Sequence, residues 1–208
     1  MRGGLSPDDL RLPPAPKGLR IGLYGGSFNP PHDAHRLVAE TALRRLRLDR
    51  LWWMVSPGNP LKDNGLLRPL AERVAASRAL VTDRRIVVTA FEATNRCTYT
   101  ADTLEQVLDR RPGVSFVWVM GGDSLAGFHN WKDWPRIART LPIAVVDRPG
   151  ATLAPLYAPM ARTFAGHRLK EVDAGALASR AAPAWVYLHG PRSPLSSTAI
   201  RAAEAAAS

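Results

Sequence analysis

The 208-residue sequence predicts an α/β fold: a doubly wound, mostly parallel β-sheet with helices on both faces. Three observations predict it. Six runs rich in apolar, β-branched or aromatic residues recur along the chain, and most are hydrophobic throughout, as strands buried on both sides are. Helical patterns lie between these runs. Alternation of this kind gives right-handed β–α–β units, with ligand sites beyond the carboxyl ends of the strands.

The predicted strands are residues 19–24, 51–56, 85–90, 115–120, 142–147 and 185–189. In the first predicted helix, 35–48, Val38, Ala42 and Leu46 recur every four residues and form one apolar face. The ranges 69–82 and 101–111 have the same character. Residues 151–184 contain prolines and little periodicity, so we expect a surface excursion there.

Composition bounds the class of protein. Hydrophobic residues make up 46% and charged residues 22%, which excludes a wholly disordered or collagen-like chain. The single Cys97 excludes an internal disulfide, and no apolar run approaches the roughly 18–20 residues of a membrane span. Residues 1–17 hold four prolines and no apolar stretch, unlike a secretory signal. We expect a flexible tail over 1–17, a single domain over 18–208 and a cytoplasmic location.

The formal net charge of +10 favours anionic ligands. Only four of the 28 basic residues are lysines, and the arginines are scattered along the chain rather than gathered. This pattern indicates compositional bias, so we expect no nucleic acid and no membrane as partner.

The loop after the first predicted strand begins Gly25-Gly26-Ser27-Phe28 and runs into a helix. Paired glycines let the backbone approach a ligand closely, and the N–H groups of a helix start attract an anion. His32 and His35 share one helix face. The loop is neither a Walker loop nor a dinucleotide fingerprint. His-x-x-His could be half of a metal site, but no third ligand follows at a recognisable spacing, so phosphate chemistry is favoured.

A second candidate anion site follows the last predicted strand. Ser196 or Ser197 can cap the terminal helix, leaving hydroxyls, including that of Thr198, for phosphate oxygens. Arg201 lies one turn further on, where its guanidinium can grip a phosphate with two hydrogen bonds.

Three segments in the middle of the chain also follow predicted strands. Lys62 is a mobile positive charge suited to a phosphate. Tyr99 and Thr100 lie where a helix starts, with Thr100 or Asp102 as its N-cap, and a helix N-terminus prefers a carboxylate to a neutral amide.

The third of these segments is residues 121–134. Trp131 can stack on a flat ring, and Asp123 is placed either for a ribose hydroxyl or for an ordering hydrogen bond. The letters Gly-Asp-Ser-Leu at 122–125 also occur in serine esterases, but no histidine here follows an aspartate by three residues to serve as the base.

Five motifs in this order resemble those of the bacterial nicotinate-nucleotide adenylyltransferases of the nucleotidylyltransferase superfamily. They are Gly-Gly-Ser-Phe-Asn-Pro-x-His-x-x-His at 25–35, Pro-x-x-Pro-x-Lys at 57–62, Thr-Tyr-Thr-x-Asp-Thr-Leu at 98–104, Gly-x-Asp-x-Leu-x-x-Phe-x-x-Trp-x-x-Trp at 121–134 and Leu-Ser-Ser-Thr-x-Ile-Arg at 195–201. The family usually has glycine at Ala34 and isoleucine at Leu195.

The resemblance implies a Rossmann-like fold and a reaction of ATP with nicotinate mononucleotide that gives nicotinate adenine dinucleotide and pyrophosphate, a step of NAD biosynthesis. It implies a catalytic role for His32, His35 and Arg201. It places ATP on Gly25, Gly26, Ser27, Phe28, Ser196, Ser197 and Thr198. It places the mononucleotide on Lys62, Tyr99, Thr100, Asp123 and Trp131. Mg²⁺ would be held by the ATP phosphates rather than by a protein metal site, and a homo-oligomer is left open.

Three alternatives remain open at this point. The first is an adenylyltransferase for nicotinamide mononucleotide or for another phosphorylated acceptor such as phosphopantetheine, which has no aromatic ring to stack. The second is a nucleotide-binding regulator without turnover. The third is a basic nucleic-acid-binding module, which would be identified by DNA binding that depends steeply on salt concentration.

Overall fold

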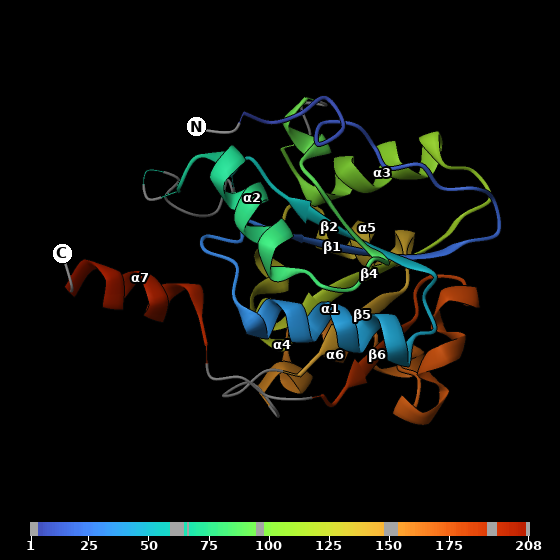
Figure 1. The fold of residues 1–208 in the computed structure, drawn as a ribbon. Coiled ribbons are helices and arrows are strands. Elements are labelled where there is room, and N and C mark those ends of the chain that lie inside the picture. Colours follow the sequence, from blue (N-terminus) through green and yellow to red (C-terminus); the bar gives the residue numbers. More distant parts are fainter. Residues whose placement is uncertain are drawn as a thin grey trace.

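A computed structural model describes residues 4–58, 65, 67–94, 98–147, 154–190 and 195–206. Its centre is a six-stranded sheet in the order β3-β2-β1-β4-β5-β6, with every neighbouring pair parallel (Figure 1). The strands are β1 (Arg20–Gly26), β2 (Arg50–Val55), β3 (Ile86–Thr89), β4 (Ser115–Gly121), β5 (Ile143–Val146) and β6 (Trp185–Leu188). The predicted doubly wound sheet is confirmed. Its strand order reverses between β1 and β4, which is where such sheets bind ligands.

Helices cover both faces of the sheet, as predicted. The α-helices are α1 (Asp33–Arg45), α2 (Leu70–Leu80), α3 (Thr100–Arg110), α4 (Gly122–Gly127), α5 (Trp134–Thr140), α6 (Pro159–Thr163) and α7 (Ser197–Ala206). Buried side chains of α1 and α2 share a core with one face, and those of α3, α4, α5 and α6 share a core with the other. Helix α7 reaches away from the body of the molecule (Figure 1). Among the described residues, none of the helices combines the length and the apolar character that a transmembrane helix needs.

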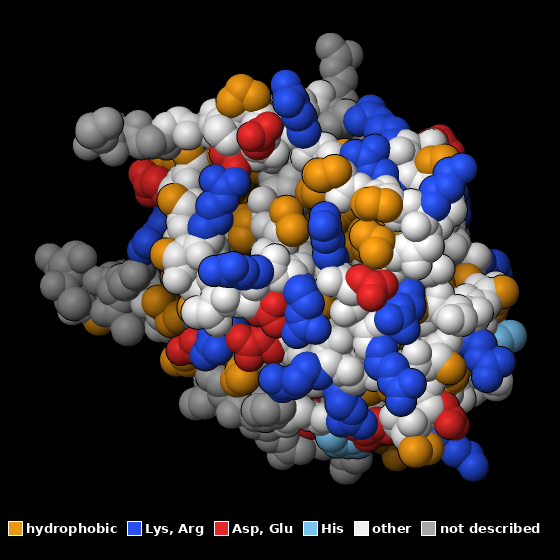
Figure 2. Space-filling model, turned by 45° about the vertical axis from the view of Figure 1, so that its right-hand side comes forward, with side chains coloured by type: hydrophobic (Ala, Val, Ile, Leu, Met, Phe, Trp, Pro, Cys, Tyr) orange, Lys and Arg blue, Asp and Glu red, His pale blue; other side chains and the backbone are white. Residues whose placement is uncertain are grey.

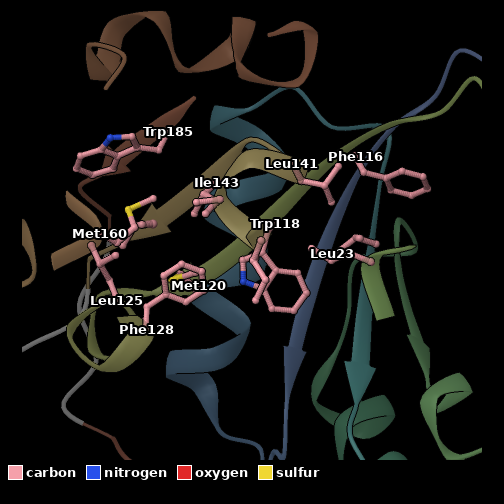
Figure 3. Packing of buried hydrophobic residues seen from close by; sticks show 14 of the residues in the cluster. Leu23, Phe116, Trp118, Met120, Leu125, Phe128, Leu141, Ile143, Met160 and Trp185 are labelled. Carbon is pink, nitrogen blue, oxygen red and sulfur yellow. The ribbon is translucent and has the colours of Figure 1, made fainter. Parts of the chain in front are cut away.

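The two cores follow from the alternation of side chains along each strand. On β4, Phe116, Trp118 and Met120 enter one core, and Val117 and Val119 enter the other. Figure 3 shows Trp118 and Met120 among the apolar side chains of the first core, near Phe128 of the short 3₁₀ helix η2 (Phe128–Asn130). These bulky residues form the floor beneath the carboxyl end of β4.

The N-terminal segment is packed against the body, although the sequence predicted a flexible tail over 1–17. In its described part, from residue 4 onward, Leu12 is buried and the backbone carbonyl of Asp9 accepts a hydrogen bond from the Ala90 N–H at 2.7 Å. The buried Asp9 carboxylate also pairs with Arg78 of α2. One apolar side chain and one buried acid therefore fasten a segment that has no helical or strand periodicity.

Residues 154–184 differ from the surface excursion expected there. They form α6 and three 3₁₀ helices: η3 (Ala154–Tyr157), η4 (Ala165–His167) and η5 (Glu171–Ser179). Met160 and Ala161 join one core, and Leu177 joins the other. This region therefore covers both faces near β6. The sequence pattern missed it because 3₁₀ helices repeat every three residues and lack the helical period that was sought.

On the face shown in Figure 2, basic side chains are spread out rather than gathered into one stripe. Figure 2 shows Lys and Arg on the face it presents, with acidic and apolar side chains among them. Several arginines form ion pairs, among them Arg20 with Asp49 and Arg85 with Asp83. These pairs neutralise part of the basic charge, and the excess of basic over acidic residues leaves the net charge positive.

Candidate active site

A cavity of about 880 Å³ opens at the carboxyl ends of the central strands. Its walls come from the loops after β1, β2 and β4, from the segment before α3 and from the start of α7. Every described residue predicted for the site lies on its wall: Gly25, Gly26, Ser27, Phe28, His32, His35, Tyr99, Thr100, Asp123, Trp131, Ser196, Ser197, Thr198 and Arg201. Lys62 falls outside the described residues. The volume matches that of a pocket for a ligand of nucleotide size.

The glycine-rich loop is shaped by close packing. A Cβ atom on Gly25 would lie 2.8 Å from the ring of Trp118, so only glycine fits there. Three residues on, Phe28 has a φ of 44° and a side chain buried against Trp53, with ring centroids 4.5 Å apart. The backbone of the loop thus faces the cavity, while the Phe28 side chain anchors it from behind.

The two histidines lie side by side at the start of α1. Their ring centroids are 3.8 Å apart, and His32 is buried. Nδ1 of His35 accepts a hydrogen bond from the His32 backbone N–H at 3.3 Å. A ring nitrogen that accepts carries no proton, so neutral His35 is protonated on Nε2. The pair therefore presents an imidazole N–H donor beside the glycine loop.

The start of α7 meets the glycine loop from the far end of the chain. Ser196 Oγ accepts from the Ala199 N–H at 3.1 Å, so Ser196 is the N-cap. Ser197 Oγ donates to the Pro30 carbonyl at 3.0 Å, and an Arg201 guanidinium N–H donates to the Asn29 carbonyl at 2.5 Å. These contacts place the arginine beside the loop and settle the choice between the two serines.

Helix α3 begins one residue earlier than predicted. Its N-cap is Tyr99, with no side-chain cap, instead of Thr100 or Asp102. Tyr99 has the extended backbone that an N-cap needs, and the helix then starts at Thr100. The first N–H groups of the helix therefore lie at the cavity wall. Lys132 Nζ lies 4.2 Å from the centre of the Tyr99 ring and adds a positive charge to this region.

Trp131 contributes a flat aromatic ring to the same cavity wall. Its ring packs edge-on against Phe128, with centroids 5.2 Å apart, and against Trp118 at 6.2 Å. Phe128 is fully buried, as expected of a core residue, whereas Trp131 is half-buried and borders the cavity. Asp123 is exposed in the first turn of α4 and also borders the cavity.

Sequence reasoning missed two titratable groups in this wall, Glu92 and Lys132. Glu92, in η1 (Phe91–Ala93), borders the cavity, and its Oε1 accepts a hydrogen bond from Thr103 Oγ of α3 at 2.9 Å. Burial raises the pKa of Glu92 to about 7, against the opposing effect of that hydrogen bond. Glu92 lies outside every recognisable motif, so no sequence signal identified it. Lys132 was also missed, although it lies within the quoted 121–134 segment.

The donor set of the site suits phosphates better than a resident metal. Within the described ranges, no three His, Cys, Asp or Glu side chains gather where a metal ion could be held. Instead, imidazole, guanidinium, hydroxyl and backbone N–H groups surround one space, and all of them can donate hydrogen bonds to anionic oxygens.

Comparison with known proteins agrees with this geometry. A family model described as cytidylyltransferase-like matches residues 23–203. A probable nicotinate-nucleotide adenylyltransferase of Rhizobium meliloti is 62% identical over 89% of this chain and 99% of its own. One of Mesorhizobium japonicum is 60% identical over 91% of this chain and 97% of its own.

Solved structures show the same fold. A Plasmodium falciparum nicotinic acid mononucleotide adenylyltransferase, solved in complex with NaAD, superposes with a TM-score of 0.65. It covers 88% of this chain and 83% of its own at 16% identity, which establishes the fold alone. From the family model and the close relatives, the chain belongs to the cytidylyltransferase-like family and, within it, to the nicotinate-nucleotide adenylyltransferases.

Proposed function

We propose that this protein joins ATP to nicotinate mononucleotide, giving nicotinate adenine dinucleotide and pyrophosphate. The observation that carries the proposal is the convergence of phosphate-binding and ring-binding groups, from segments as far apart in sequence as Gly25 and Arg201, on one cavity. The relatives named for this activity share most of the chain, which supports the same reaction here.

The chemistry requires positioning more than it requires a reactive side chain. The mononucleotide phosphate is already a nucleophile. One of its oxygens forms a bond to the α-phosphorus of ATP, and the bond from that phosphorus to the β-bridging oxygen breaks, so pyrophosphate leaves with the electron pair. No proton has to be removed first. Catalysis then consists of aligning the reactants and stabilising charge on the α-phosphate and the leaving group.

The triphosphate lies, in this proposal, between the glycine loop, α1 and α7. Backbone N–H groups of Gly25–Phe28 and the imidazoles of His32 and His35 bind it. The His35 Nε2–H contacts the α-phosphate, where charge develops in the transition state. Arg201 and the hydroxyl-rich turn Ser196–Thr198 bind the β- and γ-phosphates. ATP enters as its Mg²⁺ complex, because Mg²⁺ is usually held by substrate phosphates and waters rather than by an all-protein cage.

The pyridine ring lies on Trp131, and its carboxylate faces the first turn of α3. The positive end of that helix and Lys132 favour an anion over a neutral amide there. Asp123 is placed for a ribose hydroxyl of the mononucleotide, and Lys62 for its phosphate.

Pyrophosphate release tests this proposal. The protein is supplied with Mg²⁺-ATP and, in parallel, with nicotinate mononucleotide, nicotinamide mononucleotide or phosphopantetheine. Turnover that prefers the nicotinate substrate supports the reaction and the role of α3. A preference for the amide substrate still supports the reaction class but contradicts the role that we assign to Tyr99 and Thr100. No turnover with any acceptor, from folded protein, contradicts the proposal and favours a nucleotide-binding regulator.

A further inference from the structure

Arg73 of α2 is a charged residue that the reaction scheme leaves unused. Its side chain is 2% exposed, and its guanidinium is absent from the cavity wall. Burial lowers the pKa of Arg73 from its ordinary value, yet a guanidinium stays protonated in proteins. A fully buried charge is costly unless it is well satisfied, so its partners indicate what it does.

Within the described residues, the Arg73 guanidinium has four acceptors, and all are main-chain carbonyl oxygens. Nη1 donates to Ser27 at 2.6 Å and to Ser56 at 2.7 Å. Nη2 donates to Pro57 at 3.1 Å, and Nε donates to Arg68 at 2.9 Å. The side chain therefore ties together the loop after β1 and the loop after β2, which are the two loops at the carboxyl ends of these neighbouring strands.

These bonds also fix which way the next N–H groups face. A peptide unit is planar and trans, so the carbonyl of one residue and the N–H of the next point in opposite directions. A Ser27 carbonyl held by Arg73 turns the Phe28 N–H away from Arg73. A Pro57 carbonyl held by Arg73 does the same to the Gly58 N–H. Arg73 lies behind the loops, whereas Phe28 and Gly58 both line the cavity in front of them.

The two N–H groups are available to a ligand. Neither donates a hydrogen bond to another described residue. No carboxylate in the described part of the chain neutralises Arg73, so its charge adds to the positive potential at both N–H groups. Two N–H donors backed by a buried cation form an arrangement suited to phosphate oxygens.

We propose that Arg73 is the positioning residue of the triphosphate site, holding the Ser27 and Pro57 carbonyls so that the Phe28 and Gly58 N–H groups face the bound phosphates. This rests on the proposed function for the identity of the ligand. It adds the Gly58 N–H to the anion site and assigns the orientation of both loops to one side chain that touches no substrate.

Two variants of Arg73 test the proposal beside two controls, one for stability and one for net charge. Arg73→Met removes the charge and the four hydrogen bonds while keeping a long side chain, and Arg73→Lys keeps the charge with fewer bonds. Val74→Ala is the matched control for stability, because Val74 is buried on the same helix and lies off the cavity wall. Arg85→Met is the control for net charge, since Arg85 is half-exposed and pairs with Asp83.

Binding of Mg²⁺-ATP, measured by calorimetric titration at a temperature where each variant is folded, is the deciding readout. We expect Arg73→Met to weaken ATP binding and to lower kcat, each about tenfold or more, with Arg73→Lys in between. We expect Val74→Ala to lower Tm with ATP binding within about twofold of the parent, and Arg85→Met to leave it within the same range.

If Arg73→Met and Val74→Ala have equal ATP affinities when their Tm values are matched, the role of Arg73 is purely structural and the proposal is overturned. If Arg73→Met does not fold, Arg73→Lys decides by the same comparison. This experiment is independent of the acceptor. Wild-type protein that binds Mg²⁺-ATP without turning over any mononucleotide would overturn the proposed function, while the Arg73 comparison would still be read from ATP affinity.

Discussion

The backbone N–H of His32 and the Nδ1 atom of His35 are 3.3 Å apart, and this hydrogen bond fixes which nitrogen of His35 carries the proton. The remaining nitrogen, Nε2, is then the donor that can stabilise charge on a phosphate.

Replacing His35 by alanine should lower kcat by about 10²-fold or more, since the loss of one transition-state donor typically has this effect. His35→Asn keeps an amide near Nδ1 and lacks the Nε2–H, so we expect it to retain Tm and lose kcat similarly. Steady-state kinetics of both variants provide the check. An unchanged kcat with only a raised KM would show that His35 does not stabilise the transition state.

Trp131→Ala should mainly weaken binding of the mononucleotide, because a stacked ring contributes to that substrate alone. We expect the KM for nicotinate mononucleotide to rise about tenfold, with the KM for ATP within about twofold of the parent. Trp131→Phe keeps an aromatic face and should recover most of the loss. Equal KM values for the mononucleotide in the parent and in Trp131→Ala would contradict the stacking proposal.

Glu92 should make stability depend on pH. Its pKa is about 7 in the folded protein and 4.5 ordinarily, so the folded state holds a proton that the unfolded chain has lost between these values. The stabilisation that this group provides is fully present below pH 4.5 and is lost as the pH rises toward 7. Glu92→Gln should therefore be more stable than the parent at pH 8, by on the order of 3 kcal/mol.

Urea denaturation of parent and Glu92→Gln at about pH 5 and about pH 8 measures this difference. The advantage of the variant should grow between the two values. A constant difference across the range would show that Glu92 does not titrate there.

The N-terminal segment should contribute to stability through Asp9. The carboxylate is 2% exposed, pairs with Arg78 and accepts from the Ser6 N–H at 2.7 Å. Asp9→Asn should cost about 1–3 kcal/mol, because the buried carboxylate loses its charge and with it the ion pair to the half-exposed Arg78. Asp8, whose side chain is 88% exposed, supplies the matched control, and Asp8→Asn should be nearly neutral. Equal effects of the two changes in chemical denaturation would mean that the segment is not fastened through Asp9.

The strands were predictable because the strands of a parallel sheet are buried on both faces and therefore appear as continuous hydrophobic runs in the sequence. The helices were predictable where their apolar residues recur with the helical period. The regions that escaped prediction are held by long-range contacts to other segments rather than by a local periodic pattern. The docked segment around Asp9 and Leu12 has no period of its own, and the 3₁₀ helices near β6 do not repeat with the helical period.

The site shows the same division. Its motifs could be recognised in the sequence because glycine, histidine and hydroxyl residues occur at spacings that their local geometry requires. Gly25, which packs closely against the ring of Trp118, is one example. The roles of Arg73 and Glu92 could not be predicted in this way. Their roles depend on carbonyl groups and a hydroxyl contributed by other segments, which only the folded chain brings together.

The central claim is a direct displacement at the α-phosphorus of ATP, aligned by the cavity and without a covalent enzyme intermediate. The most direct measurement is the configuration at phosphorus of the dinucleotide formed from nicotinate mononucleotide and one stereoisomer of adenosine 5′-(α-thiotriphosphate). A single in-line step inverts that configuration, and this is the result we predict. Retained configuration would require two displacements through an enzyme-bound adenylyl group and would contradict the account.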